Sequence, residues 1–135
     1  MKQFKTVLKV KKFEETQILE NINNVNIEID SLQNNINSIE KNIKNAINSV
    51  DSTDSNDERR ALTSIIENLK ESWKSEEHKK YLALQRKNSL SQELILKKQE
   101  IKSIEMIIEK KEYEAKLVEL KKEQDALDEL NIADY

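Results

Sequence analysis

The chain has 135 residues, with no glycine, proline or cysteine, and its formal net charge is only -3 although 36% of its residues are charged. Glycine and proline serve the sharp turns of folded chains, so a chain without either is expected to form a few very long helices. The lack of cysteine excludes disulfides and thiolate metal sites, and the near-balanced charge argues against nucleic acid as the main partner.

The first predicted helix covers about residues 3–50. Apolar residues recur at alternating steps of four and three from Ile18 to Val50, which is the pattern of a sustained coiled-coil seam. The positions of this seam are Phe4, Leu8, Lys11, Glu15, Ile18, Ile22, Val25, Ile29, Leu32, Ile36, Ile39, Ile43, Ala46 and Val50. Such strict spacing favours a folded helix over disorder, which is the rival interpretation of a charged, aromatic-poor chain.

A turn is predicted at about residues 51–57. The run Asp-Ser-Thr-Asp-Ser-Asn-Asp consists of side chains that bond to nearby backbone and favour turns and helix caps. Asp54, Ser55 or Asn56 is expected to cap the next helix, with Asp57 and Glu58 in its first turn, where acidic side chains are favourable to the helix dipole.

The second predicted helix covers about residues 58–131, and its seam is less regular. The spacing holds through Leu62, Ile66, Leu69 and Trp73, is interrupted by polar residues from Glu76 to Lys87, and resumes in a third group. That third group is Leu90, Leu94, Lys97, Ile101, Ile104 and Ile108, after which the frame slips to Tyr113, Leu117, Leu120, Gln124 and Leu127. A slip of this kind changes the partner that the helix faces.

These elements predict an all-α fold with one domain, an antiparallel coiled-coil hairpin spanning residues 1–135. If Val50 lies opposite residue 60, paired residue numbers sum to about 110, and Phe4 faces about residue 106. Because an α-helix rises 1.5 Å per residue, the second helix is longer than the first and overhangs it by about 25 residues. The overhang is expected to carry an uncovered apolar stripe that needs a partner, comprising Met106, Ile107, Ile108, Tyr113, Leu117, Val118, Leu120 and Leu127.

No catalytic, cofactor or metal site is expected. His78 is the sole histidine, the carboxylates are spread along helices, and a glycine-rich phosphate loop is impossible. We therefore predict that the chain is not an enzyme, that His78 is solvated and that Trp73 packs on the seam. The lysine-rich start, Lys2 to Lys12, is compatible with docking on an acidic surface or anionic lipid, but we favour a solvated helix end that has its own packing stripe.

The two ends of the chain resemble the FliJ family of flagellar export proteins, to which YscO-type stalk proteins of type III secretion are related. The start, Phe4 to Lys12 followed by Glu14-Glu15, is similar to the start of that family. The C-terminal part of the chain resembles the family more strongly than the start does. There, Ile104-Glu105 and Glu109-Lys110-Lys111 are followed by Glu114 and then by residues 121–130, Lys-Lys-Glu-Gln-Asp-Ala-Leu-Asp-Glu-Leu.

The resemblance implies a stalk at the centre of a hexameric export ATPase, which it enters by its terminal coiled coil and links to a membrane export gate. It also implies a general export chaperone that works with other export chaperones. The expected partner-binding residues are Phe4, Leu8, Met106, Ile107, Tyr113, Leu117, Leu120 and Leu127.

Two other functions remain open, a self-associating structural coiled coil and a chaperone that binds export substrates directly. With no secretory signal or membrane span in the sequence, we expect a cytoplasmic protein, peripheral at the inner-membrane export apparatus if the resemblance holds. In isolation we expect a monomer.

Overall fold

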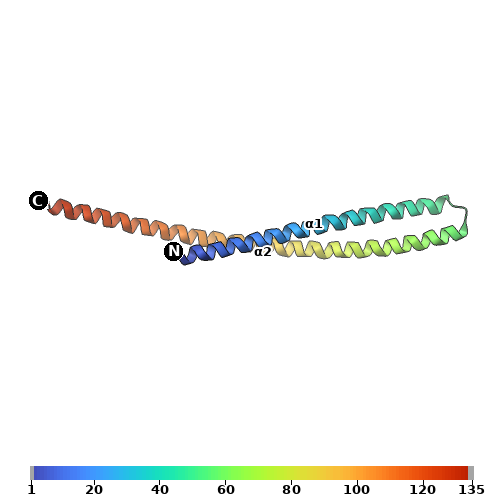
Figure 1. Cartoon of the computed structure of the whole chain (residues 1–135), viewed down its shortest axis with the longest axis horizontal. Coiled ribbons are helices and arrows are strands. Elements are labelled where there is room, and N and C mark those ends of the chain that lie inside the picture. Colours follow the sequence, from blue (N-terminus) through green and yellow to red (C-terminus); the bar gives the residue numbers. More distant parts are fainter. Residues whose placement is uncertain (1, 134–135) are drawn as a thin grey trace. The chain divides into compact units, whose positions relative to one another are not determined.

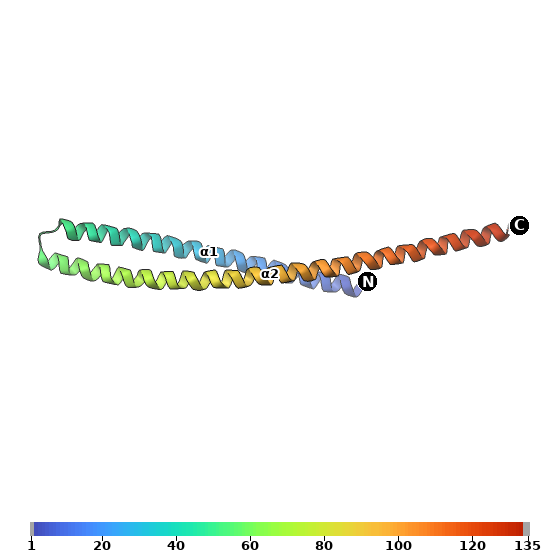
Figure 2. The same ribbon diagram turned by 180° about the vertical axis from the view of Figure 1, so that it is seen from behind.

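The computed structural model describes residues 2–133 and contains two α-helices. Helix α1 spans Lys2–Ser52 and helix α2 spans Asn56–Ala133, so the second helix is the longer by far. The ribbon in Figures 1 and 2 shows the two helices joined by one short connection. There is no strand among the described residues, and the predicted all-α hairpin with a longer second helix is confirmed.

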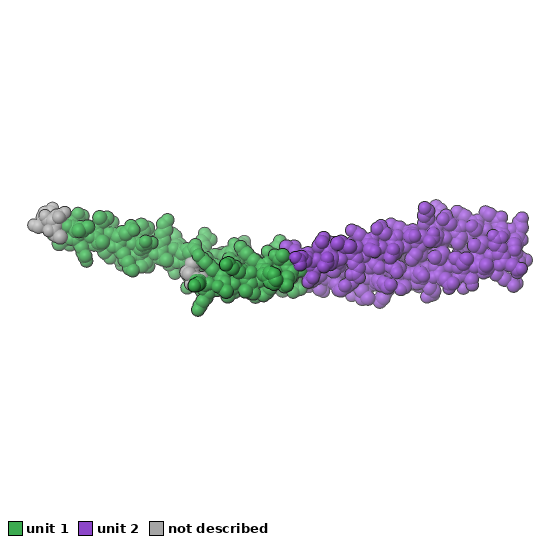
Figure 3. Space-filling view, in the orientation of Figure 1, with its two compact units in different colours: residues 1–18, 93–135 green, residues 19–92 purple. Residues whose placement is uncertain are grey.

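The chain divides into two units, coloured separately in Figure 3. Unit 2 comprises residues 19–92, which include the connection and the helical segments on either side of it. Unit 1 comprises residues 1–18 and 93–135, so it holds the start of α1 and the last part of α2. Each unit is an antiparallel helix pair with its own buried seam.

The core of unit 2 is a single seam between its two helical segments. Val25 and Leu32 of α1 pack with Ala83 of α2, and Ile29 and Leu90 are partly buried against them. The remaining buried residues of this unit are Ile36 and Ala46. Every seam position predicted for α1, from Phe4 to Val50, is buried or partly buried, because a four-three spacing keeps these side chains on one helical face.

The seam of α2 is continuous where the sequence indicated an interruption. Positions 76, 80, 83 and 87 keep the four-three spacing and are all buried or partly buried, and Ala83 is fully buried. The polar side chains are accommodated rather than excluded: the Lys80 ammonium donates to the Gln33 side-chain oxygen at 2.5 Å. Long polar side chains can place their stems in a seam and their charged ends at its edge, which composition alone does not reveal.

The connection between the helices is Thr53 to Ser55, and it is closed by side-chain hydrogen bonds. Ser55 caps α2, because its Oγ accepts from the Glu58 backbone N–H at 3.3 Å and its carbonyl accepts from Arg59 N–H at 3.1 Å. The Thr53 hydroxyl donates to Glu58 Oε2 at 2.7 Å and accepts from Ser55 N–H at 3.2 Å. No described residue has a positive φ, so the turn needs no glycine.

Unit 1 has a smaller core with more ionic contacts. Its buried side chains are Ile18 of α1 and Ile101 and Ile108 of α2. Lys11 and Lys97 occupy seam positions on opposite helices, and both bond to carboxylates beside them. The apolar seam therefore gives way to an ionic layer between Ile18 and Leu8.

The register is offset by a few residues from the predicted one. Cross-helix pairs in both units have residue numbers that sum to between 111 and 117, rather than to about 110. Phe4 accordingly lies beside Lys111 and not beside residue 106. Helical side chains lean toward the N-terminus of their own helix, so in an antiparallel pair each contact is made by residues about one position further along both chains.

Candidate functional site

The candidate site is the exposed end of α2. Every residue from Glu109 to Ile132 is exposed, and we call this range the C-terminal segment. Ile108, which the sequence analysis placed in the uncovered stripe, is instead buried at 8% exposure against the start of α1. The correction follows from the register, because an offset of a few residues extends the cover of α1 past residue 106.

Two contacts mark where the cover of α1 ends. The Lys111 ammonium lies 5.5 Å from the centre of the Phe4 ring, a distance at which a cation is attracted by the ring face. Lys5 and Glu112 form an ion pair at 3.2 Å. Among the described residues, α2 continues beyond Glu112 as a single helix, and its residues up to Ile132 are all exposed.

Most of the large apolar residues of this part of α2 form one exposed stripe, which we call the distal stripe, whereas Val118 is 55% exposed on the face that continues the seam toward α1. The members of the distal stripe are 40–62% exposed and comprise Met106, Ile107, Tyr113, Leu117, Leu120 and Leu127. Most lie two positions after the seam frame of Ile101, Ile104 and Ile108, which is about 160° around the helix from the face toward α1. The distal stripe is therefore on the far side of α2.

The other two predicted partner-binding residues lie elsewhere. Phe4 and Leu8 are partly buried in the seam of unit 1, on the α1 face that packs toward α2. They are not brought together with the distal stripe. Leu96, which the sequence analysis did not select, is 60% exposed and lies on the same helical face as Met106. The same spacing, extended toward the N-terminus from Met106, could have found it.

An ionic cluster joins the two helices of unit 1. Lys97 Nζ lies 2.5 Å from Glu14 Oε2 and 3.4 Å from Glu100 Oε2, and Lys11 Nζ lies 3.1 Å from Glu100. The hydrogen bond from Lys97 lowers the pKa of Glu14 below 4.5, and that from Lys11 lowers the pKa of Glu100. The bond to Glu14 raises the pKa of Lys97 above 10.5. All three shifts favour the charged, paired state.

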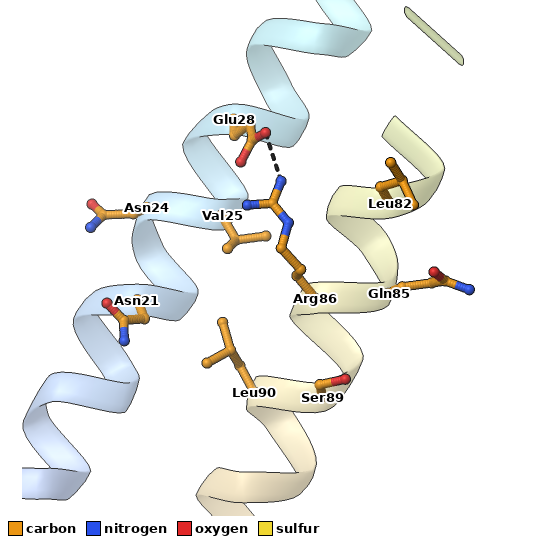
Figure 4. Close-up of a pocket in the computed structure, with 9 residues that line it drawn as sticks. All are labelled: Asn21, Asn24, Val25, Glu28, Leu82, Gln85, Arg86, Ser89 and Leu90. Atoms are coloured by element: carbon orange, nitrogen blue, oxygen red, sulfur yellow. Dashed lines mark hydrogen bonds and ion pairs between the residues drawn. The ribbon is translucent and has the colours of Figure 1, made fainter. Parts of the chain in front are cut away.

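Unit 2 contains an open groove of about 850 Å³ between its helices, drawn in Figure 4. Val25 and Leu90 lie between the two helices, and Arg86 crosses the groove to donate to Glu28 Oε1 at 2.7 Å. The remaining lining is polar apart from Leu82, and consists of Asn21, Asn24, Gln85 and Ser89. The polar groups that line the groove are one ion pair, neutral amides and a serine hydroxyl, and they do not form a catalytic arrangement or a metal-ligand set.

The residues considered from the sequence as candidates for a chemical role do not form a catalytic arrangement. Trp73 is partly buried on the seam and its indole N–H donates to Glu40 Oε1 at 3.1 Å, while His78 is exposed. Among residues 2–133, no three His, Cys, Asp or Glu side chains gather as a metal site would require. Neither helix, over the same residues, contains a stretch with the length and hydropathy of a membrane span.

A comparison with known families gave a match over the whole length of the chain. The family model described as flagellar FliJ protein matches residues 1–135, which is the entire chain. The chain belongs to the FliJ family. This FliJ-family membership makes it a protein of flagellar export. A search of the curated proteins gave no significant match, and neither did a search of the solved structures.

For a FliJ-family protein, the geometry singles out α2 rather than any pocket as the surface that is free to bind. The helix pairs of both units use their seams internally, whereas the distal stripe lies on the far side of α2 and is exposed. An exposed row of large apolar side chains on a single helix indicates a protein-binding face.

Proposed function

We propose that this chain is the central stalk of a hexameric flagellar export ATPase, that its C-terminal segment enters the ring, and that it links the ring to the export gate in the membrane. The observation that supports this role is the C-terminal segment, which is exposed at every position and carries the distal stripe in a FliJ-family protein. The stalk role itself is what the family resemblance implies.

The chemistry of the segment suits a mechanical partner. A single helix inside a six-fold ring presents a different face to each subunit, so it can favour one nucleotide state in one subunit over its neighbours without any reaction of its own. The distal stripe supplies the apolar contact, at Tyr113, Leu117, Leu120 and Leu127. Charged residues of both signs occupy the rest of the surface, which suits a contact that must be remade with each subunit in turn.

A truncation that ends at Tyr113 tests this proposal without removing the helix pair of unit 1. It keeps Ile108, the Lys5–Glu112 ion pair and the Phe4–Lys111 contact, and deletes only residues 114–135. We expect the truncated chain to remain helical by circular dichroism, to lose capture of the cognate export ATPase and to lose stimulation of its ATP hydrolysis. Full stimulation by the truncated chain would refute the stalk role.

Point substitutions locate the contact more finely. Leu117→Asn and Leu120→Asn remove exposed apolar side chains from the distal stripe, and we expect each to weaken ATPase capture by about tenfold, which is typical for an apolar anchor in an interface. Ile65→Asn is the matched control, because Ile65 is similarly exposed but lies in unit 2. Equal losses from all three variants would contradict a specific role of the stripe.

A second candidate function, direct binding of export substrates or of export chaperones, is favoured by the groove of unit 2. Its apolar floor at Val25 and Leu90 and its amide rim can take a polypeptide segment. Arg86→Ala would remove the Glu28 partner and open the groove. If this variant changes the binding of a labelled substrate and leaves ATPase stimulation intact, the groove has a separate role; if substrate binding is unaffected, the second function fails.

A further inference from the structure

The distal stripe has the spacing of a second coiled-coil seam, distinct from the seam toward α1. In heptad notation Leu117 occupies position a and Leu120 position d. The complete set is Ser103, Lys110, Leu117 and Gln124 at a, with Met106, Tyr113, Leu120 and Leu127 at d. Half of the a positions are long polar residues, which is typical of a seam that specifies its partner at some cost in stability.

The residues that flank this second seam alternate in charge from one heptad to the next. Positions g are Lys102, Glu109, Lys116 and Glu123, and positions e are Ile107, Glu114, Lys121 and Asp128. None of these residues takes part in an ion pair within the part of the chain that the structure describes. Their charges are therefore available to a helix that packs on the stripe.

A parallel, in-register pair of copies is opposed by these charges. In parallel coiled coils a g residue meets the e residue of the following heptad of the other helix. Every charged pair formed in this way is of like sign: Glu109 with Glu114, Lys116 with Lys121, and Glu123 with Asp128. Like charges across a seam are destabilising, so a parallel, in-register homodimer is disfavoured.

We propose that a second copy of this chain packs on the distal stripe in antiparallel orientation, with Leu117 of each copy opposite Leu120 of the other. In this register Lys116 faces Glu123 of the second copy, and Glu114 faces Lys121. The two-fold axis repeats each contact, so four flanking pairs of opposite charge form. The residues of all four pairs would meet residues of like charge in a parallel, in-register pair.

The layers within the seam are compatible with this register. Leu117 and Leu120 form a central apolar layer with their counterparts in the second copy. Tyr113 lies opposite Gln124, which gives the phenol hydroxyl an amide partner. Lys110 lies opposite Leu127 and next to Asp128, so its stem packs and its ammonium reaches a carboxylate.

Neighbouring antiparallel registers are opposed by charge. A slip of one heptad toward the N-terminus sets Lys116 against Lys116 of the second copy and Glu114 against Glu114. A slip in the other direction sets Glu123 against Glu123 and Lys121 against Lys121. Alternation of charge with every heptad therefore selects one register out of the three, which is a recognised way of specifying coiled-coil partners.

The inference concerns the isolated protein and does not depend on the stalk proposal. It replaces the sequence-based expectation of a monomer, which considered a single seam, with an equilibrium between monomer and dimer. Because the contact covers about three heptads and contains polar layers, it is expected to be weak. The dimer would cover the distal stripe, and an ATPase that needs the same stripe would dissociate it.

Sedimentation equilibrium of the full chain, from low micromolar to near-millimolar concentration, tests the proposal. We expect the mean mass to rise from 15.9 kDa toward twice that value. Lys116→Glu alone and Glu123→Lys alone should each raise the dissociation constant by about tenfold or more, since each places two like-charge pairs in the dimer. An equimolar mixture of these two variants should form a heterodimer as tight as the original homodimer, because both pairs are then of opposite sign.

Lys122→Glu is the matched control, because it makes the same charge change at a position that faces away from the seam. It should leave the dissociation constant within about twofold of the original. A monomer at every concentration would overturn the proposal. Tighter association of the Lys116→Glu variant would also overturn it, because that substitution would bring opposite charges together only in a parallel pair.

Discussion

Unit 2 and the C-terminal segment carry the same kind of sequence pattern with opposite outcomes. Both have apolar residues at steps of four and three. In unit 2 that row is covered by the returning helix, and Leu32 is 8% exposed, whereas Leu120 in the C-terminal segment is 51% exposed. Periodicity thus shows that a helix has a face to bury, and the side on which the neighbouring helix packs decides whether the same molecule buries it.

The first prediction compares identical truncations in the two regions. Leu32→Ala should lower the free energy of unfolding by about 2–4 kcal/mol, because it removes a buried side chain and leaves a cavity. Leu120→Ala should change it by no more than about 0.5 kcal/mol. Urea denaturation followed by circular dichroism, at a concentration where the chain is monomeric, measures both. Comparable losses would show that the two regions are packed alike.

The second prediction enlarges a side chain in the same two regions. Ala83 is fully buried between the helices of unit 2, so Ala83→Leu should cost about 1–3 kcal/mol through overpacking. Ala115 is exposed in the C-terminal segment, and Ala115→Leu should be nearly neutral. Thermal unfolding of the two variants is the measurement. A neutral Ala83→Leu variant would mean that the seam has free space beside Ala83 and is not tightly packed there.

The third prediction concerns the cap that starts α2 in unit 2. Ser55→Ala removes the acceptor of the Glu58 backbone N–H and should lower the free energy of unfolding by about 1 kcal/mol. Ser75→Ala, at an exposed position inside the helix, is the control and should be neutral or slightly stabilising. An unchanged Ser55→Ala variant in a urea titration would indicate that water replaces the cap without loss.

The fourth and smallest prediction uses pH to loosen the paired part of unit 1. The pKa values of Glu14 and Glu100 are lowered in the folded protein, so their contribution is complete above their ordinary value of 4.5 and is lost as pH falls through the lowered values. The pKa of Lys97 is raised, so its contribution is complete below 10.5 and is lost as pH rises through the raised value. The protection of the amides of residues 8–14 against exchange should therefore decrease as pH falls below 4.5.

The Glu14→Gln variant provides the control for that pH effect. Its amide cannot ionise, so the variant should begin with weaker protection of residues 8–14 at pH 7 and should lose less of it on acidification. The amides around Leu32, which lies in the apolar core of unit 2, should change little in either protein over the same range. A uniform loss of protection in both units would contradict the assignment of the effect to this cluster.

Much of the fold could be predicted from sequence because the signals are local. The seam of α1 was predicted at every position, and the turn residues, including Ser55 as a possible cap, lie where the connection forms. Two predictions were wrong, and both depended on the facing helix. The seam was expected to be interrupted from Glu76 to Lys87 but continues there, and Ile108 was expected to be uncovered but is buried. A polar residue in a seam position is tolerated when the facing helix offers a hydrogen-bond partner, as Gln33 does for Lys80. The spacing of residues along one helix does not show which group of the other helix faces each position.

The candidate site shows the same division. The exposed positions of Tyr113, Leu117, Leu120 and Leu127 agree with the slip of the heptad frame, while their role in binding stays a prediction. Leu96 was missed although the spacing of the distal stripe, extended toward the N-terminus from Met106, reaches it; the structure shows that Leu96 is exposed there.

The sequence by itself determined that this protein is two long helices with one turn, because the absence of glycine and proline and the spacing of apolar residues act within each helix. Only the tertiary structure decided the register, the end of the cover of α1 at Glu112, and the helical face that remains open. These properties depend on how side chains of two distant segments lean and fit against each other, and a free energy shared between two segments cannot be assigned from either one alone.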